Sequence, residues 1–227
     1  MATSAQVTAF FKDMGKLCVV ETKARIASNR GFVLPSVAMA QAALETGYGT
    51  SGLMTKANAY FGIKAGSSWT GKVYSSATGE VYNGVSVVIT ATFRAYDTKA
   101  ASVTDYYDLI VGSSRYANAV STVDRILTPY NTIYAIWDSG YATDPEYVSK
   151  IMTIINNYNL TTWDGKIDED LTDEELEQLN YSGTGYGSSA GSITGTTPIS
   201  TFRYEIEEVV SLTSYYNIHE LEEEKAL

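Results

Sequence analysis

A short β-hairpin pattern between helical patterns is the feature that most constrains how this chain folds. Residues 69–95 contain alternating, β-branched runs, and Asn83-Gly84 separates two of them. Asn-Gly between such runs is the strongest short-range signal for a hairpin turn. On both sides of this region, apolar residues recur at helical spacing instead. The sequence therefore predicts an α+β fold that is predominantly α, with one small β-hairpin lobe.

The helical pattern appears in five segments, and the predicted helices cover 4–29 (as one helix or a pair), 36–46, 100–111, 114–127 and 145–158. In the last of these, Asp144 is expected to cap the helix and Pro145 to occupy its first position. Residues 58–65 are expected to form a short turn that leads into extended chain.

The composition divides the 227 residues near Gly165. Residues 1–165 carry 13 Lys and Arg against 12 Asp and Glu, a net charge of +1, whereas residues 166–227 carry 3 against 14, a net charge of −11. We expect one domain over residues 1–165. An acidic helix and a linker rich in Gly, Ser and Thr are expected over 166–198, and an acidic C-terminal segment over 199–227.

The C-terminal segment alternates apolar residues at Phe202, Tyr204 and Ile206, a pattern that is compatible with ordered structure. Its 29 residues are too few to bury a core alone. It therefore packs on the first domain, pairs with another chain, or belongs to a longer protein. We expect an assembly or packing role for residues 199–227, through self-association or incorporation into a larger particle.

Cys18 is the only cysteine and His219 the only histidine. A disulfide within one chain is excluded, and a zinc site built on Cys and His has too few ligands. Cys18 lies on an apolar helical face and is predicted to be a core residue. We expect no metal and no cofactor, which leaves carboxylates and tyrosines as catalytic groups. The absence of a basic stripe or a long apolar run predicts no nucleic-acid partner and no membrane span.

Residues 40–49 place one carboxylate at the end of an apolar, alanine-rich helix. Pro35 and Ser36 are expected to open this helix, with Ser36 as its cap, and Gly47 to close it. Glu45 then lies in the last turn, where the helix dipole and apolar surroundings both raise the pKa of a carboxyl group. A carboxylic acid that stays protonated near neutral pH can protonate the leaving oxygen of a glycoside. The alternative is a solvated Glu at a frayed helix end.

Four groups of residues resemble the peptidoglycan endo-β-N-acetylglucosaminidases of glycoside hydrolase family 73, which include flagellar hydrolases, autolysins and phage lysins. They are Ala40–Gly49, Ala57–Lys64, Phe93–Tyr96 with Ser102 and Asp105, and Tyr141–Pro145 with Tyr147 and Lys150. The resemblance covers about residues 5–160. It implies a lysozyme-like helical domain whose β-lobe faces the helix that bears the acid.

The resemblance also implies a function. The substrate would be the β-1,4 bond after N-acetylglucosamine in the glycan strands of peptidoglycan, and the catalytic positions fall on Glu45, Glu80 and Tyr141. Glu80 lies beside the hairpin turn and suits a base that activates water, which would give inversion. In the alternative mechanism, the acetamido group of the substrate attacks and Tyr141 orients it. Outside catalysis, Glu80 would be a polar turn residue and Tyr141 a staple at the start of a helix.

Several aromatic and polar residues near these motifs are candidates for sugar binding. The chain has 18 tyrosines, and tyrosine joins a flat apolar face to a hydroxyl group, which suits a sugar surface. The candidate substrate-binding residues are Tyr48, Asn58, Tyr60, Phe61 and Trp69. For Phe61 and Trp69, burial in the core is an equally good interpretation.

Two other function classes remain open in the sequence. Residues 51–54 faintly resemble a motif of lytic transglycosylases, although they lie close after Glu45 and lack the Gln that follows that motif. A non-catalytic peptidoglycan-binding or structural phage component is the second alternative. Residues 1–6 are not followed by an apolar stretch of the kind found in a signal peptide. We therefore expect a phage-type lysin that is released by a holin or carried on a virion, or a protein whose leader has been removed.

Overall fold

The computed structural model describes residues 2–82 and 85–167. The elements in chain order are α1 (Ser4–Ala27), α2 (Pro35–Thr46), α3 (Gly52–Ala57), β1 (Val73–Tyr82), β2 (Val85–Arg94), α4 (Lys99–Gly112), the 3-10 helix η1 (Ser114–Ala119), α5 (Pro129–Asp138), α6 (Tyr147–Asn157) and α7 (Thr161–Asp164). This confirms the predicted class, which is mostly helical with one β-hairpin. The acidic helix, linker and C-terminal segment predicted beyond residue 167 lie outside the described residues.

Helix α2 lies at the centre of the helical core. It packs against α1, α5, α6 and α7. Its small residues Ala38, Ala40, Ala42 and Ala43 are fully buried, which lets neighbouring helices approach closely. Because α2 is held on several sides, its C-terminal turn, which carries Glu45, is fixed by the core.

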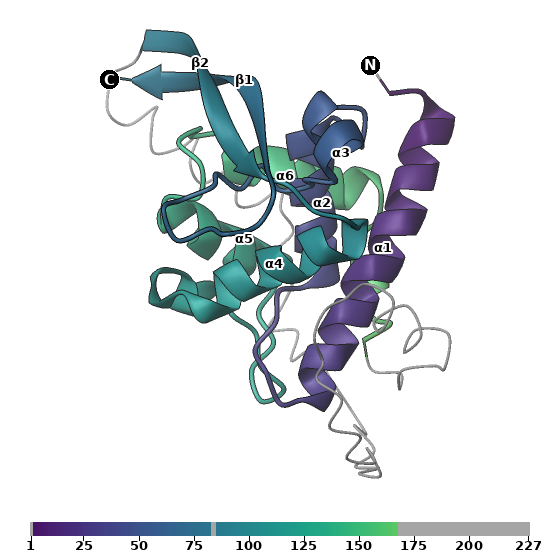
Figure 1. Ribbon diagram of the computed structural model, residues 1–227. Coiled ribbons are helices and arrows are strands. Elements are labelled where there is room, and N and C mark those ends of the chain that lie inside the picture. The colour runs from purple at the N-terminus through teal and green to yellow at the C-terminus, as the bar shows by residue number, and fades with distance from the viewer. Residues whose placement is uncertain (1, 83–84, 168–227) are drawn as a thin grey trace, which may run out of the picture. The chain divides into compact units, whose positions relative to one another are not determined.

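The two strands pair in antiparallel register from Val73 opposite Arg94 to Tyr82 opposite Val85. That register brackets the predicted Asn-Gly turn and confirms the hairpin. In Figure 1 the hairpin extends away from the helices at one end of the fold. Phe93 is buried at its base, whereas Val88 farther along β2 is 78% exposed. The lobe is therefore attached at its base and projects from there.

The start of α2 differs from the expectation. The N-cap residue is Leu34, Pro35 occupies the first turn, and Ser36 does not act as the cap. Instead, the backbone N–H of Ser36 donates to Oδ1 of Asp164 in α7 at 2.8 Å. A carboxylate from a distant helix therefore binds the free N–H group that a local serine was predicted to satisfy.

The predicted helix over 114–127 is wrong beyond residue 119. After η1 the chain becomes extended, because Ser121 pairs with Phe32 through two backbone hydrogen bonds of 2.9 Å. The hydroxyl of Ser121 also accepts from the N–H of Leu127 at 3.1 Å. These contacts with a distant loop outweigh the local helical pattern.

The structure also differs from the prediction at helices α5 and α6. Helix α5 was not predicted, although Thr128 caps it and Pro129 occupies its first turn. Helix α6 begins at Tyr147, two residues later than expected. Asp144 accepts from the N–H of Glu146 at 2.9 Å and so shapes the turn before α6, without capping the helix itself.

The first helix is continuous from Ser4 to Ala27, which decides between one helix and a pair. Cys18 is fully buried on it, as predicted. No helix among residues 2–82 and 85–167 is long and apolar enough to cross a membrane.

Candidate active site

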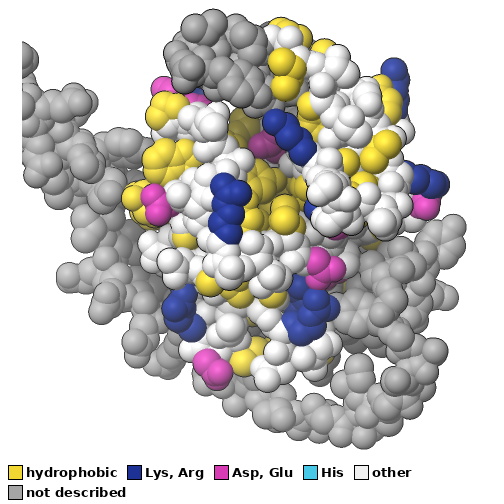
Figure 2. Space-filling model, turned by 60° about the vertical axis from the view of Figure 1, so that its left-hand side comes forward, with side chains coloured by type: hydrophobic (Ala, Val, Ile, Leu, Met, Phe, Trp, Pro, Cys, Tyr) yellow, Lys and Arg dark blue, Asp and Glu magenta, His cyan; other side chains and the backbone are white. Residues whose placement is uncertain are grey.

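Glu45 lies in the last turn of α2, just before Gly47, whose left-handed conformation (φ 56°) ends the helix. Its side chain is accessible to solvent, while the protein around it still desolvates the carboxyl group. The face of the molecule in Figure 2 has a hollow with hydrophobic side chains on its floor and an acidic side chain within it. The carboxyl group of Glu45 can therefore meet a substrate without being fully hydrated.

One hydrogen bond fixes the carboxyl group of Glu45, and Gly62 lies on its other side. The hydroxyl of Tyr147 donates to Oε1 at 3.1 Å. On the other side, a Cβ added to Gly62 would lie 3.5 Å from Oε2. Burial raises the pKa of Glu45 and the hydrogen bond from Tyr147 lowers it, with a net rise. The rise agrees with the direction predicted from the sequence, and its main cause is desolvation.

Tyr141 lies in the turn between α5 and α6, and its hydroxyl donates to the carbonyl oxygen of Phe61 at 2.9 Å. Its ring centroid is 6.1 Å from that of Tyr147. Burial raises the pKa of Tyr141 far above its ordinary value, and the nearby charges of Tyr147 and Glu45 raise it further. Tyr141 therefore keeps its proton and can act as a hydrogen-bond donor but not as a base.

Glu80 lies in β1, where its backbone is paired with Val87 close to the hairpin turn. The side chain of Glu80 lies outside the described part of the structure. The backbone therefore places Glu80 on the lobe, as the sequence predicted, and gives no distance to Glu45.

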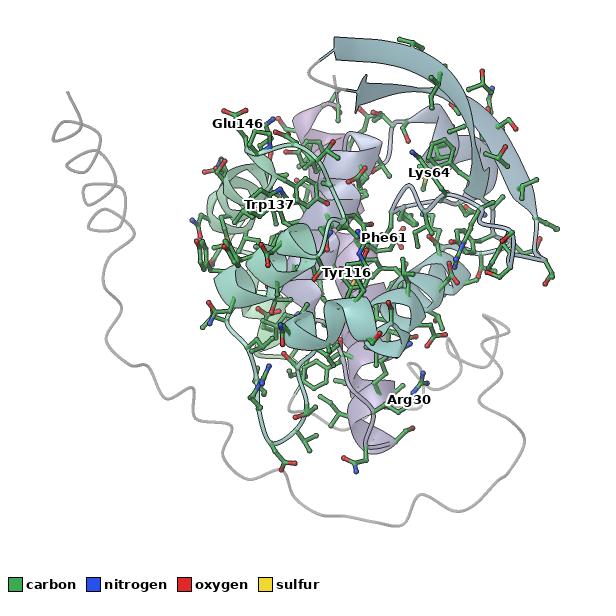
Figure 3. The ribbon with its side chains drawn as sticks, turned by 90° about the vertical axis from the view of Figure 1, so that its left-hand side faces the viewer. Arg30, Phe61, Lys64, Tyr116, Trp137 and Glu146 are labelled. Carbon is green, nitrogen blue, oxygen red and sulfur yellow. The ribbon has the colours of Figure 1, made fainter. Side chains whose placement is uncertain are left out.

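Tyr60 and Phe61, two of the predicted sugar contacts, lie in the core. Their exposed fractions are 1% and 2%. The ring of Phe61 stacks on Tyr106 with centroids 3.9 Å apart. In Figure 3, Phe61 lies near the centre, between Lys64 under the hairpin and Tyr116 among the helices. Because both side chains are buried, a sugar ring cannot stack on them in this conformation.

Asn58 and Tyr48 also make structural contacts. Asn58 ends α3 in a left-handed conformation, and its side chain donates to the carbonyl oxygens of Tyr96 at 3.1 Å and Asp97 at 3.2 Å. Tyr48 packs edge-on against Phe10 and Phe11. Both side chains stabilise the segments that follow α2 and α3.

Trp69 is half-buried at the start of the lobe. Its Nε1 donates to the carbonyl oxygen of Lys72 at 2.9 Å, and the guanidinium of Arg94 lies 4.6 Å from the ring centroid. Arg94 is itself held by two hydrogen bonds to Asp105, at 2.8 and 2.9 Å. The ring of Trp69 is therefore partly accessible near the lobe, so its predicted role as a sugar contact stays open.

The sequence matches a protein-family model described as "Glucosaminidase: Mannosyl-glycoprotein endo-beta-N-acetylglucosaminidase" over residues 21–160, more than half of the chain. The chain belongs to this glucosaminidase family. The matched region includes α2 with Glu45, the β-hairpin with Glu80, and the turn with Tyr141.

Comparison with individual proteins also finds glucosaminidases and peptidoglycan hydrolases that are similar to this chain. The chain is 37% identical over 142 residues to the exo-glucosaminidase LytG of Bacillus subtilis and 36% identical over 136 residues to the peptidoglycan hydrolase FlgJ of Salmonella typhimurium. These matches cover 62% and 58% of this chain, and 50% and 42% of the relatives, so the chain spans half or less of their length. A solved peptidoglycan hydrolase mutant from Sphingomonas sp. A1 matches with a TM-score of 0.55 and 37% identity, over 68% of this chain and 96% of that one.

Two residues of this glucosaminidase site were not predicted to have roles. Tyr147 contacts Glu45 directly, and Gln41 contacts Tyr147. A signal for Gln41 existed, because residues four apart in a helix share a face, which places Gln41 beside Glu45. Tyr147 could not be paired with Glu45 from the sequence, since 102 residues separate them.

The site contains no cluster of His, Cys, Asp and Glu suited to a metal ion, as far as residues 2–82 and 85–167 are concerned. The groups that the structure gathers around Glu45 are tyrosines, an amide and backbone atoms. Their chemistry is proton transfer and hydrogen bonding.

Proposed function

We propose that this chain is a cell-wall hydrolase that cleaves the β-1,4 bond after N-acetylglucosamine in peptidoglycan glycan strands, as an endo-β-N-acetylglucosaminidase. The observation that carries the proposal is Glu45, a carboxyl group with a raised pKa at the end of a buried helix, within the region matched by the glucosaminidase family. The names of the relatives, which include peptidoglycan hydrolases, support peptidoglycan as the substrate.

Glu45 acts as the general acid. As the bond between the anomeric carbon and the glycosidic oxygen breaks, Glu45 transfers its proton to that oxygen and the leaving sugar departs as an alcohol. The acid must be protonated before the reaction. Activity is therefore retained below the raised pKa of Glu45 and is lost as the pH rises through it.

Two groups can complete the reaction. In the first route, Glu80 removes a proton from water, which attacks the anomeric carbon from the opposite face and inverts it. In the second, the acetamido oxygen of the substrate attacks that carbon, and water then opens the resulting ring. Tyr141 donates its hydroxyl proton to the carbonyl oxygen of Phe61, and its hydroxyl oxygen can accept from the acetamido N–H and so orient that group in this second route.

The decisive experiment digests purified peptidoglycan and identifies the products by mass spectrometry. We expect hydrolysed fragments with N-acetylglucosamine at the new reducing end, and Glu45→Gln should lower turnover at least about a hundredfold. Glu146→Gln is the matched control, since the side chain of Glu146 is 72% exposed and pairs only at the surface with Lys150. Equal turnover by Glu45→Gln and the wild type would remove Glu45 from the mechanism.

The same products separate the alternatives. Anhydro ends would indicate a lytic transglycosylase, and absence of any product would indicate a binding or structural protein. Release of single sugars from the ends of glycan strands would indicate an exo-glucosaminidase, the activity for which LytG is named. We expect cleavage within the strands instead. For the second catalytic group, Glu80→Gln should lower turnover about a hundredfold if Glu80 is the base. A change of only a few fold would favour the acetamido route.

We further propose that residues 199–227 mediate assembly and do not contact the substrate. Their alternating apolar residues support a packing surface, and their acidity would repel anionic wall polymers. The test is a truncation that removes residues 199–227 and measures self-association and turnover.

A further inference from the structure

Glu45 lies at one end of a line of buried hydrogen-bonding groups that come from three helices. Tyr106 of α4 donates its hydroxyl proton to Oε1 of Gln41 in α2. Nε2 of Gln41 donates to the hydroxyl oxygen of Tyr147 in α6 at 3.0 Å, and this hydroxyl donates to Oε1 of Glu45 at 3.1 Å. The exposed fractions of Tyr106, Gln41 and Tyr147 are 0%, 0% and 3%.

In the structure, the donors and acceptors of these groups form one continuous arrangement. An amide has an acceptor oxygen and a donor nitrogen, and Tyr106 occupies the oxygen of Gln41. With its oxygen bound to Tyr106, Gln41 presents its nitrogen to Tyr147. Because the oxygen of Tyr147 already accepts from Gln41, the one hydroxyl proton of Tyr147 points to Glu45. In this arrangement, the hydrogen bond from Tyr106 to Gln41 favours the orientation in which Glu45 receives a proton donor.

The two carboxyl oxygens of Glu45 consequently differ. Oε1 accepts from Tyr147, whereas Oε2 faces the backbone of Gly62. Gly62 has a left-handed conformation (φ 57°), which favours glycine, and its lack of a side chain keeps the space next to Oε2 open. Oε2 is therefore the oxygen with room for a proton and for an approaching substrate.

We propose that Tyr106, Gln41 and Tyr147 form a positioning relay that holds Oε1 of Glu45 and leaves Oε2 to deliver the proton to the glycosidic oxygen. The inference rests on the proposed function of Glu45 as the acid and adds the oxygen and the supporting residues. During the step, the bond between Oε2 and its proton breaks and a bond between the glycosidic oxygen and that proton forms. The negative charge left on the carboxylate is stabilised by the hydroxyl of Tyr147.

A purely structural network would have a different signature. Buried polar groups cost stability unless they are paired, and here each link of the relay is paired. Removing a hydroxyl from any paired buried tyrosine lowers stability. Only a hydroxyl that acts through Glu45 also changes the protonation of Glu45.

Glu45 faces several other titratable groups, all of which the test leaves unchanged. Tyr141 faces it from the turn before α6, and Tyr116 of η1 contacts Tyr141. A change in the titration of Glu45 after a single substitution in the relay therefore reports on the relay.

The test measures the pH profile of kcat/KM and, independently, the titration of Glu45 by carbon NMR in glutamate-labelled protein, with Glu45→Gln to assign the signal. Tyr147→Phe removes the hydrogen bond that stabilises the ionised carboxylate. We expect both the alkaline limb of the profile and the NMR titration to move to higher pH. We also expect kcat to fall about tenfold with KM unchanged, because the acid is less well placed.

Tyr106→Phe is the sharper variant, since Tyr106 does not contact Glu45. Without its hydroxyl, the amide of Gln41 can rotate and present its oxygen to Tyr147, which then donates to Gln41 and not to Glu45. We expect a shift in the same direction as for Tyr147→Phe. The matched control is Tyr107→Phe, because Tyr107 is equally buried in α4 but its hydroxyl contacts Thr22 at 3.1 Å. It should lower stability and leave the profile in place.

The NMR titration and the turnover measurement distinguish a failure of the proposed relay from a failure of the proposed acid role of Glu45. If the NMR titration of Glu45 stays at its wild-type pH in both Tyr147→Phe and Tyr106→Phe, the relay is overturned. An equal shift in Tyr107→Phe would also overturn it, because the effect would then be general to buried tyrosines. If the NMR titration moves in the two relay variants while Glu45→Gln retains full turnover, the relay holds and the proposed acid role of Glu45 fails.

Discussion

At the scale of single residues, a carboxyl group with a raised pKa lies at each end of helix α2. Asp164 binds the N-terminal turn through the N–H of Ser36, and Glu45 lies in the C-terminal turn. A helix dipole favours an anion at the N-terminus and disfavours one at the C-terminus. The pKa nevertheless rises at both ends, because burial is the larger effect at each.

Asp164 gives a stability prediction with a definite sign. Burial raises its pKa from 3.8 to about 6, so the folded state holds the proton more tightly than the unfolded state does. Stability from this group is therefore present below the ordinary pKa and is lost as the pH rises toward 6. Asp164→Asn should stabilise the protein above pH 6 by up to about 3 kcal/mol, since the amide oxygen can still accept from Ser36.

The measurement is the melting temperature of Asp164→Asn and of the wild type across pH. We expect the difference between them to be small near pH 4 and to grow as the pH rises through about 6. A difference that is constant with pH would mean that Asp164 does not titrate in this range.

Residue-scale prediction from the sequence succeeded where the cause is local. Glu45 could be placed at a helix end because the apolar spacing and Gly47 are close to it in the chain. Its contact with Tyr147 and the contact of Ser36 with Asp164 could not be predicted, because each joins residues more than a hundred positions apart. Such contacts depend on how helices pack, which local patterns do not specify.

At the scale of elements, the hairpin and the long helices followed their patterns. The segment 114–127 did not, since Ser121 pairs with Phe32 and holds the chain extended. The sugar contact predicted at Tyr60 illustrates the same limit, whereas the burial of Phe61 agrees with the alternative that the sequence left open. Their motif was informative about the family, whereas only packing against elements such as α4 decided that the two side chains are buried.

Packing between α1 and α7 gives an element-scale prediction. Gly15 lies inside α1, where glycine costs about 0.5–1 kcal/mol relative to alanine. A Cβ at this position would lie 2.5 Å from the ring of Trp163. Gly15→Ala should therefore destabilise the protein by about 1–3 kcal/mol despite the better helix propensity of alanine.

Denaturant unfolding checks this, with Gly112→Ala as the matched control. Gly112 ends α4, and a Cβ there would meet nothing within 4 Å. We expect that variant to be neutral or slightly stabilising. Stabilisation by Gly15→Ala would show that Trp163 moves aside and that the contact between α1 and α7 is weak.

At the scale of the whole molecule, charge separates the catalytic region from the rest of the chain. Residues 1–165 have a net charge of +1 and residues 166–227 one of −11. Peptidoglycan is accompanied by anionic polymers in the wall, so the acidic part is unsuited to hold the enzyme there. The composition therefore favours a division in which the helical domain acts on the glycan and residues 199–227 contact protein.

Truncation after Asn180 tests this division. The shortened chain keeps Ile167, which is 3% exposed and belongs to the packed core. We expect the full chain to self-associate through residues 199–227, and the shortened chain to have a lower mass in light scattering with unchanged turnover on peptidoglycan. The shortened chain should also adsorb more strongly to walls at low salt, a difference that closes as salt screens the acidic residues. An unchanged mass would overturn self-association, and a loss of turnover would show that the segment serves catalysis.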